Sequence, residues 1–170
     1  NVMHSLLGKL RSHALAAAVM AAAAACMLFG TAHANEQVRY QFFIDGPLYK
    51  KVVDKLKDQE LYAYLNEFQT KPYLGFFETD LNGDGIKELF VAPGDDFYFC
   101  HEDNTCDVYI LMRTKDGFAR AASIRANEIV VADTKTNGVR DLILFNNPHN
   151  RDEYTVYKYN REKAVYEPAK

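Results

Sequence analysis

The sequence predicts an α+β fold, in which an N-terminal helical segment packs on an antiparallel β-meander. Two observations lead to this prediction. Helix-forming residues with apolar side chains at helical spacing extend over about residues 47–68. Over about residues 73–168, short apolar runs are separated by turn-forming Asn-Gly and Asp-Gly steps. We therefore expect a single domain over residues 35–170, preceded by a separate segment at residues 1–34.

This N-terminal segment has the features of an export signal. Lys9 and Arg11 form a positively charged start, an alanine-rich apolar run follows at 14–29, and Ala32-His33-Ala34 matches a small-residue cleavage site. The apolar run is shorter than the roughly 20 residues that a membrane span needs. We predict a signal peptide at residues 1–34, a mature chain without a membrane span, and a periplasmic or secreted location.

Cys26 leaves one alternative open for the same segment. A lipidated cysteine would anchor the chain to a membrane. However, Ala23-Ala24-Ala25 precedes it without a leucine, and Met27-Leu28-Phe29 continues the apolar run beyond it. Cleavage after Ala34 is therefore the expectation that we carry forward.

The charge of the mature chain argues against a nucleic-acid partner. The signal contains two of the 20 basic residues and none of the 23 acidic residues, which gives the mature chain a net charge of −5. Nucleic-acid binding needs a basic surface. An acidic surface suits cation binding, and we expect the partner to be another protein or an envelope component.

The helical prediction depends on side-chain spacing and on the residues at its ends. A first extended run is expected at 38–44, and Pro47 suits the first position of the helix that follows. Lys71-Pro72 ends the region, because the residue before proline is biased away from helix. The apolar residues at helical spacing are Leu48, Val52, Val53 and Leu56, and then Leu61, Tyr64, Leu65 and Phe68.

Everything after Pro72 is predicted to form strands joined by turns. The segments are rich in aromatic and β-branched residues. Asp116-Gly117 and Asn137-Gly138 stand between apolar runs and predict hairpins. The expected strands are 74–79, 86–92, 106–113, 118–124, 128–132, 139–145, 153–159 and 164–166.

The most distinctive motif is an acidic loop between the first two of these strands. Oxygen-bearing side chains occur at alternate positions, and Gly85 follows the third, where glycine makes a sharp turn without strain. A hard cation such as Ca²⁺ binds about six to eight oxygen atoms. The sequence therefore predicts a calcium-loop hairpin whose ligands are Asp80, Asn82, Asp84, the backbone carbonyl of Ile86, and Glu88.

This loop differs from an EF-hand. An EF-hand closes with a glutamate at the twelfth loop position, inside a helix. Here that position is Val91, and the carboxylate stands at the ninth position, Glu88. The flanking segments are also predicted strands. The alternative is a turn that binds no metal, because Asn-Gly and Asp-Gly steps are strong turn formers by themselves.

Two cysteines, Cys100 and Cys106, remain after signal cleavage. An even number of cysteines in an exported domain predicts a disulfide. The loop that it closes is short, so the bond would contribute about 2 kcal/mol. His101 and the acidic residues nearby leave a metal site as the alternative, but zinc sites use paired Cys and His at defined spacing, and the mature chain has no second pair.

The pattern resembles small exported bacterial proteins that carry one calcium-loop repeat similar to the FG-GAP repeats of integrin-type propellers. The residues that carry this resemblance are 80–85 with Glu88-Leu89, the cysteines around a short loop, and the elements at 136–142 and 157–159. It covers about residues 74–166 and implies ligation by the first, third, fifth, seventh and ninth loop positions, which are the five residues named above. The ninth position is Glu, where integrin-type repeats usually have Asp. One repeat cannot form a propeller, which needs several blades.

No catalytic motif stands out in the mature chain. Its histidines are His101 and His149, and it contains no Gly-Xaa-Ser-Xaa-Gly or His-Glu-Xaa-Xaa-His motif. We therefore predict a non-enzymatic interaction or stability module, a class that includes inhibitors and immunity proteins. The alternative is a periplasmic hydrolase that uses the acidic hairpin and a histidine. A cleft joining His149, Asp152 and the loop would favour it, whereas a flat surface with the loop at a hairpin tip would favour the module.

Overall fold

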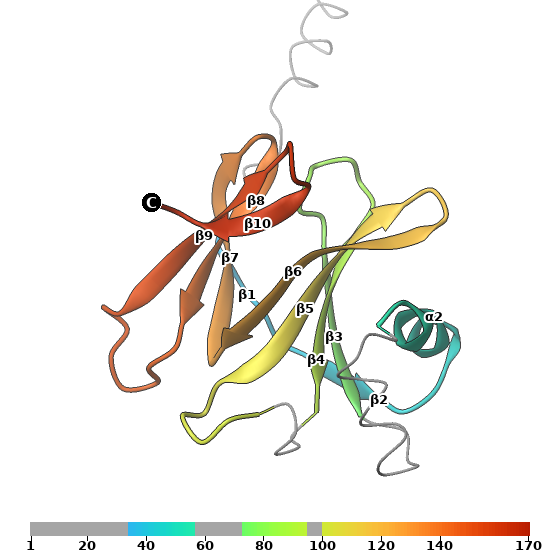
Figure 1. Cartoon of the computed structure of the whole chain (residues 1–170), viewed down its shortest axis with the longest axis horizontal. Coiled ribbons are helices and arrows are strands. Elements are labelled where there is room, and N and C mark those ends of the chain that lie inside the picture. Colours follow the sequence, from blue (N-terminus) through green and yellow to red (C-terminus); the bar gives the residue numbers. More distant parts are fainter. Residues whose placement is uncertain (1–33, 57–72, 95–99) are drawn as a thin grey trace, which may run out of the picture. The chain divides into compact units, whose positions relative to one another are not determined.

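A computed structural model describes residues 34–56, 73–94 and 100–170. Residues Ala34–Lys170 belong to one compact unit. The described residues form ten strands and one helix, α2 (Pro47–Lys55), as Figure 1 shows. The predicted signal peptide, apart from Ala34, and the part of the predicted helical segment at 57–68 lie outside the described residues.

The strands form two antiparallel sheets of five strands each. Sheet A has the order β1-β7-β8-β9-β10 and sheet B has the order β2-β3-β4-β5-β6. The strands of sheet A are β1 (Glu36–Gln37), β7 (Glu128–Thr136), β8 (Val139–Phe145), β9 (Tyr154–Asn160) and β10 (Val165–Pro168). The strands of sheet B are β2 (Gln41–Phe43), β3 (Leu74–Thr79), β4 (Glu88–Pro93), β5 (Cys106–Thr114) and β6 (Gly117–Ala126).

The turn between β7 and β8 follows the prediction from the sequence. Asn137 and Gly138 both have positive φ, at 55° and 81°. Two consecutive positive φ values suit the right-handed twist of a tight hairpin, and Asn-Gly is the pair that reaches them at least cost. The local sequence is therefore sufficient to place this turn.

The main hydrophobic core contains side chains from both sheets. Strand β4 contributes Phe90 and Ala92, β7 contributes Ile129 and Val131, and β8 contributes residues that include Leu142. Burying a large apolar side chain of this kind stabilises a fold by up to about 1.5–3 kcal/mol, measured against an extended unfolded chain. This core is the principal attachment between the two sheets.

Sheet B also buries its other face. The alternate residues of β4, Leu89 and Val91, belong to a second core that includes Tyr49 and Val52 of α2. Because successive side chains of a strand point to opposite faces, an uninterrupted apolar run such as β4 requires cover on both sides. Helix α2 supplies this cover, beginning with Pro47 in its first turn.

The expectation of an α+β fold with a single meander is wrong. Within the described residues the fold is mostly β, and the only helix there, α2, has nine residues. The meander splits at Asn127, between β6 and β7, into two sheets. The extended run expected at 38–44 is a strand only over β2, which pairs with β3 in sheet B, whereas β1 precedes the run and pairs with β7 in sheet A. Hydrophobic patterning marks strands but does not say which sheet each strand joins.

None of the helices that the structure describes is both long enough and apolar enough to cross a bilayer.

Candidate metal site

The acidic loop joins β3 to β4 and connects them as a hairpin, as the sequence predicts. Thr79 and Glu88 are the last register pair before it. Gly83 and Gly85 have φ values of +78° and +84°, which L side chains rarely adopt. These two glycines let the backbone curl so tightly that its amides face the side chains of the same loop.

Asp80 organises the curl. Its Oδ1 accepts a hydrogen bond from the Gly83 amide at 2.7 Å, and its Oδ2 accepts one from the Gly85 amide at 2.9 Å. Partial burial acts to raise the pKa of Asp80, but four backbone amides, led by that of Gly85, together lower the pKa below its ordinary value of 3.8. The carboxylate is therefore ionised at neutral pH and anchors the loop.

Asn82 and Asp84 each form an Asx turn, in which the side-chain oxygen accepts a hydrogen bond from the backbone amide two residues later. Asn82 Oδ1 accepts from the Asp84 amide at 3.0 Å, and Asp84 Oδ1 accepts from the Ile86 amide at 2.7 Å. Asn82 Nδ2 also donates to Asp84 Oδ2 at 3.0 Å. An ionised carboxylate has about four acceptor positions, so these bonds leave acceptor capacity on Asp84.

Glu88 lies at the base of the loop and is fully buried. Its Oε2 accepts a hydrogen bond from the Leu81 amide at 2.9 Å, whereas its Oε1 is buried without a hydrogen-bond partner. Burial raises the pKa of Glu88, the hydrogen bond from Leu81 opposes this rise, and the charges of Asp84 and Asp80 add to it. A buried oxygen without a partner costs free energy, so Glu88 has an incomplete set of contacts.

The structure brings the predicted ligands into one loop, but it does not close them into a cage. Among the described residues, no three His, Cys, Asp or Glu side chains converge in a group that could hold a metal ion. Ile86 is 57% exposed. The ammonium of Lys135 also lies near this loop, 3.3 Å from where a Cβ of Gly83 would be. In this conformation, backbone amides satisfy the oxygens of Asp80.

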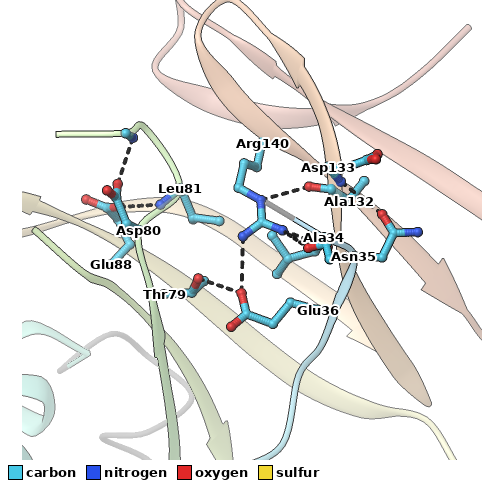
Figure 2. Close-up of polar contacts among 12 residues, drawn as sticks. Ala34, Asn35, Glu36, Thr79, Asp80, Leu81, Glu88, Ala132, Asp133 and Arg140 are labelled. Carbon is cyan, nitrogen blue, oxygen red and sulfur yellow. Dashed lines mark hydrogen bonds and ion pairs between the residues drawn. The ribbon is translucent and has the colours of Figure 1, made fainter. Parts of the chain in front are cut away.

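A buried arginine outside the predicted ligand set, Arg140, ties the loop to sheet A. The backbone amide of Arg140 donates to the carbonyl of Leu81 at 2.8 Å. Its guanidinium donates to Glu36 Oε1 at 3.1 Å, and Thr79 Oγ1 donates to the same oxygen at 2.7 Å. Figure 2 shows this chain of contacts from the loop through Glu36 to Arg140. The Arg140 side chain is 2% exposed and the Glu36 side chain is 41% exposed, so solvent reaches this ion pair mainly from the Glu36 side.

Three backbone carbonyls accept hydrogen bonds from three of the four remaining donors of Arg140. Its Nε donates to Ala132 at 2.8 Å, and its Nη2 donates to Ala34 at 2.8 Å and to Val131 at 3.2 Å. A charged group is stable in a protein interior when it is both paired and hydrogen-bonded. The signal in the sequence was an Arg-Asp pair inside an otherwise apolar strand, at 139–145.

Asp141 follows Arg140 and is also buried. Its Oδ2 accepts from Thr134 Oγ1 at 2.8 Å, and its Oδ1 is the second buried oxygen without a partner in the described part of the chain. The hydroxyl of Tyr166 donates to the Arg140 carbonyl at 2.8 Å, and burial, together with the charges of Asp141 and Glu88, raises the pKa of Tyr166. Polar groups from both sheets therefore meet behind the acidic loop.

The cysteines lie in a different loop, before β5. Cys100 and Cys106 form the disulfide that the sequence predicts, with Cα atoms 4.0 Å apart. His101 Nε2 lies 3.2 Å from Asp107 Oδ1. The disulfide occupies both sulfur atoms, so the metal site considered at these cysteines has no thiolate ligands.

The two histidines do not lie near the acidic loop. His149 follows the C-terminal end of β8, whereas the loop contacts Arg140 near the start of that strand. The strand between Arg140 and Phe145 spans about 17 Å. His101 precedes β5, and the loop contacts its other end, where Arg113 Nε donates to the carbonyl of Lys87 at 3.0 Å.

Comparison of the chain with protein-family models, with curated proteins and with solved structures found no match. The resemblance to FG-GAP-type repeats therefore stays a prediction from the sequence. The assignment of function depends on the loop itself.

Proposed function

We propose that this chain is an exported calcium-binding module without a catalytic role, and that it interacts with another protein or an envelope component in the periplasm. The ligands in this proposal are the side-chain oxygens of Asp80, Asn82 and Asp84, the carbonyl of Ile86, and Glu88. The observation that carries the proposal is the buried Oε1 of Glu88, which lacks a hydrogen-bond partner at the base of an acidic loop.

The donor set fits a hard cation. All five ligating groups are oxygens, and calcium prefers carboxylate, amide and carbonyl oxygen ligands. The charges of Asp84 and Asp80 act on the buried carboxylate of Glu88, and they make its ionised form less favourable. Bound calcium would neutralise these carboxylates. Asp80 also keeps the loop curled through the Gly83 and Gly85 amides, so part of the required curvature already exists.

The positions of the histidines support a role without catalysis. A hydrolase that used the acidic hairpin would need a histidine near the loop carboxylates. His101 and His149 lie instead toward the other ends of β5 and β8.

A tagged form of the exported protein should recover a partner from envelope fractions in the presence of calcium, which would test the interaction part of the proposal.

Thermal unfolding with and without Ca²⁺ tests the metal. Extracellular calcium modules bind at about 10⁻⁴–10⁻³ M. At a free Ca²⁺ concentration 100-fold above the dissociation constant, the domain gains about 2.7 kcal/mol, which raises the melting temperature by on the order of 10 °C. Mg²⁺ should have a much smaller effect, because it requires a compact octahedron and retains its waters.

The intact mass of the same exported sample shows whether the chain begins at Asn35.

Two variants make this measurement specific. Asp84→Asn retains an oxygen that can accept from the Ile86 amide but removes one ligand charge, so it should reduce the calcium response while the fold persists. Asp116→Ala removes a carboxylate from the exposed turn between β5 and β6 and should leave the response unchanged. If chelation does not change the melting temperature, and calorimetry detects no heat at millimolar Ca²⁺, the loop is only a turn.

A further inference from the structure

Strand β2 forms one edge of sheet B, beside β3 (Figure 1). Within the described part of the chain β3 is its one partner, so its outer edge presents unpaired backbone N–H and C=O groups. The side chains of β2 pack closely against β3. Phe42 is paired with Gly75, where any Cβ would lie 2.9 Å from the Phe42 ring, and the ring of Phe43 stacks on Phe76 with centroids 5.6 Å apart.

Within the described residues, no second strand pairs with this edge, and the short length of β2 is the main feature that limits pairing with another chain. Its apolar residues are exposed, with Phe42 at 52%, Phe43 at 42% and Ile44 at 47%. Residues 41–44 contain no charged residue and no proline, the residue types that discourage strand addition at an edge. Exposed aromatic residues beside an unpaired edge supply both backbone hydrogen bonds and apolar contact to a partner strand.

The sequence around the edge is complementary to itself. When two copies are aligned antiparallel about Phe42, Gln41 faces Phe43, and the flanking residues Arg39 and Asp45 face each other. Both charged residues are exposed, and both line the same groove of about 580 Å³ along with Gln41 and Phe43. Arg39 and Asp45 lie just outside β2, and their place in this groove puts both charges on the same side as Gln41 and Phe43.

We propose that β2 pairs with β2 of a second copy of this chain, through a two-fold axis at Phe42. A two-fold interface requires that residue i contacts residue j while j contacts i, and the Arg39–Asp45 pair satisfies this rule. Three residue pairs come from the strand itself: one between the two Phe42 residues and two between Gln41 and Phe43. The two sheets B join into one continuous sheet, and the two ion pairs close its flanks, where the chain bends after Phe43.

Sedimentation equilibrium on the purified protein, with its charge variants, tests the pairing. The native protein should form a concentration-dependent dimer. Arg39→Asp places two carboxylates opposite each other at both flanks, and Asp45→Arg does the same with two cations, so each should weaken dimerisation about tenfold or more. The double variant Arg39→Asp/Asp45→Arg restores opposite charges and should recover the native dissociation constant. Lys158→Asp makes the same charge change on an exposed position of β9 and should have no effect.

A single cysteine tests the register. Directly opposite residues have Cβ atoms about 5 Å apart, so Phe42→Cys should cross-link the dimer under mild oxidation. Gln41→Cys faces Phe43 of the other copy and should not cross-link efficiently. The native protein provides the background from its own cysteines. The proposal is overturned if the protein is monomeric at millimolar concentration, if Arg39→Asp leaves the dimer unchanged, or if the two cysteine variants cross-link equally.

Discussion

The acidic loop at 80–88 and the disulfide loop at 100–106 achieve the same local result by different means. Both reverse the chain before a strand of sheet B. The disulfide loop is closed by a covalent bond and by a hydrogen bond from the His101 amide to the Thr105 carbonyl at 2.8 Å. The acidic loop is held by hydrogen bonds from its own amides to Asp80 and by contacts at its base.

The difference shows how the closure of a loop decides what can change it. A covalent closure responds to reduction and very little to pH or ions. A closure by carboxylates responds to whatever alters their charge, including a proton or a cation. The acidic loop also depends on residues far away in the sequence, because its attachment to sheet A passes through Glu36 and Arg140. The disulfide loop is contacted by residues that are less distant in the sequence, since Arg125 and Asn127 lie 22 and 23 positions from their partners Asp103 and Asn104.

The largest effect is expected from removal of the distant attachment. Arg140→Met deletes the guanidinium that bridges Glu36 and three carbonyls, and it should cost about 3 kcal/mol in the free energy of unfolding. The cost lies at the lower end for a broken buried pair because the Glu36 side chain is 41% exposed. Urea denaturation measures it, and Arg161→Met, on an exposed arginine, should cost much less.

Hydrogen exchange in the same variant sharpens the comparison between the loops. The amides of Gly83 and Gly85 should exchange faster in Arg140→Met, whereas the amide of His101 should keep its protection. Equal loosening of both loops would mean that Arg140 supports the fold as a whole rather than the acidic loop.

Reduction of the disulfide should have the next largest effect. Replacing both Cys100 and Cys106 by serine removes a short closed loop and should cost about 2 kcal/mol, measured by urea denaturation. The calcium response of the acidic loop should survive, because the two loops share no ligand. Loss of that response in the double serine variant would contradict the independence of the two loops.

The smallest effect concerns the charge of Glu88. Because burial raises its pKa above the ordinary value of 4.5, the folded chain holds this proton more tightly than the unfolded chain. The stability associated with Glu88 is therefore present at low pH and is lost as the pH rises from 4.5 through the folded pKa.

A neutral substitution should remove this loss. In chelator at pH 7, Glu88→Gln should be more stable than the native protein, and the difference should disappear below pH 4.5. The same variant should lose most of its stabilisation by calcium. Urea titrations at several pH values measure both effects, and a Glu88→Gln variant that is less stable at pH 7 would show that the ionised carboxylate is well satisfied.

Local features of this protein followed from its sequence because they depend on nearby residues. The turn at Asn137-Gly138, the curl at Gly83 and Gly85, and the disulfide between Cys100 and Cys106 involve residues no more than a few positions apart. Short-range backbone preferences decide such elements. The strands from β3 onward also lie close to their predicted ranges.

Only the tertiary structure decided how those strands are divided and what lies behind the acidic loop. The apolar run of β4 shows that both of its faces are buried, but nothing in it says that sheet A covers one face and α2 the other. Glu36 and Arg140 meet across 104 positions of sequence, and their contact requires both sheets to be in place. Sequence patterns report the periodicity of each segment, whereas the pairing of distant segments depends on the free energy of the assembled core.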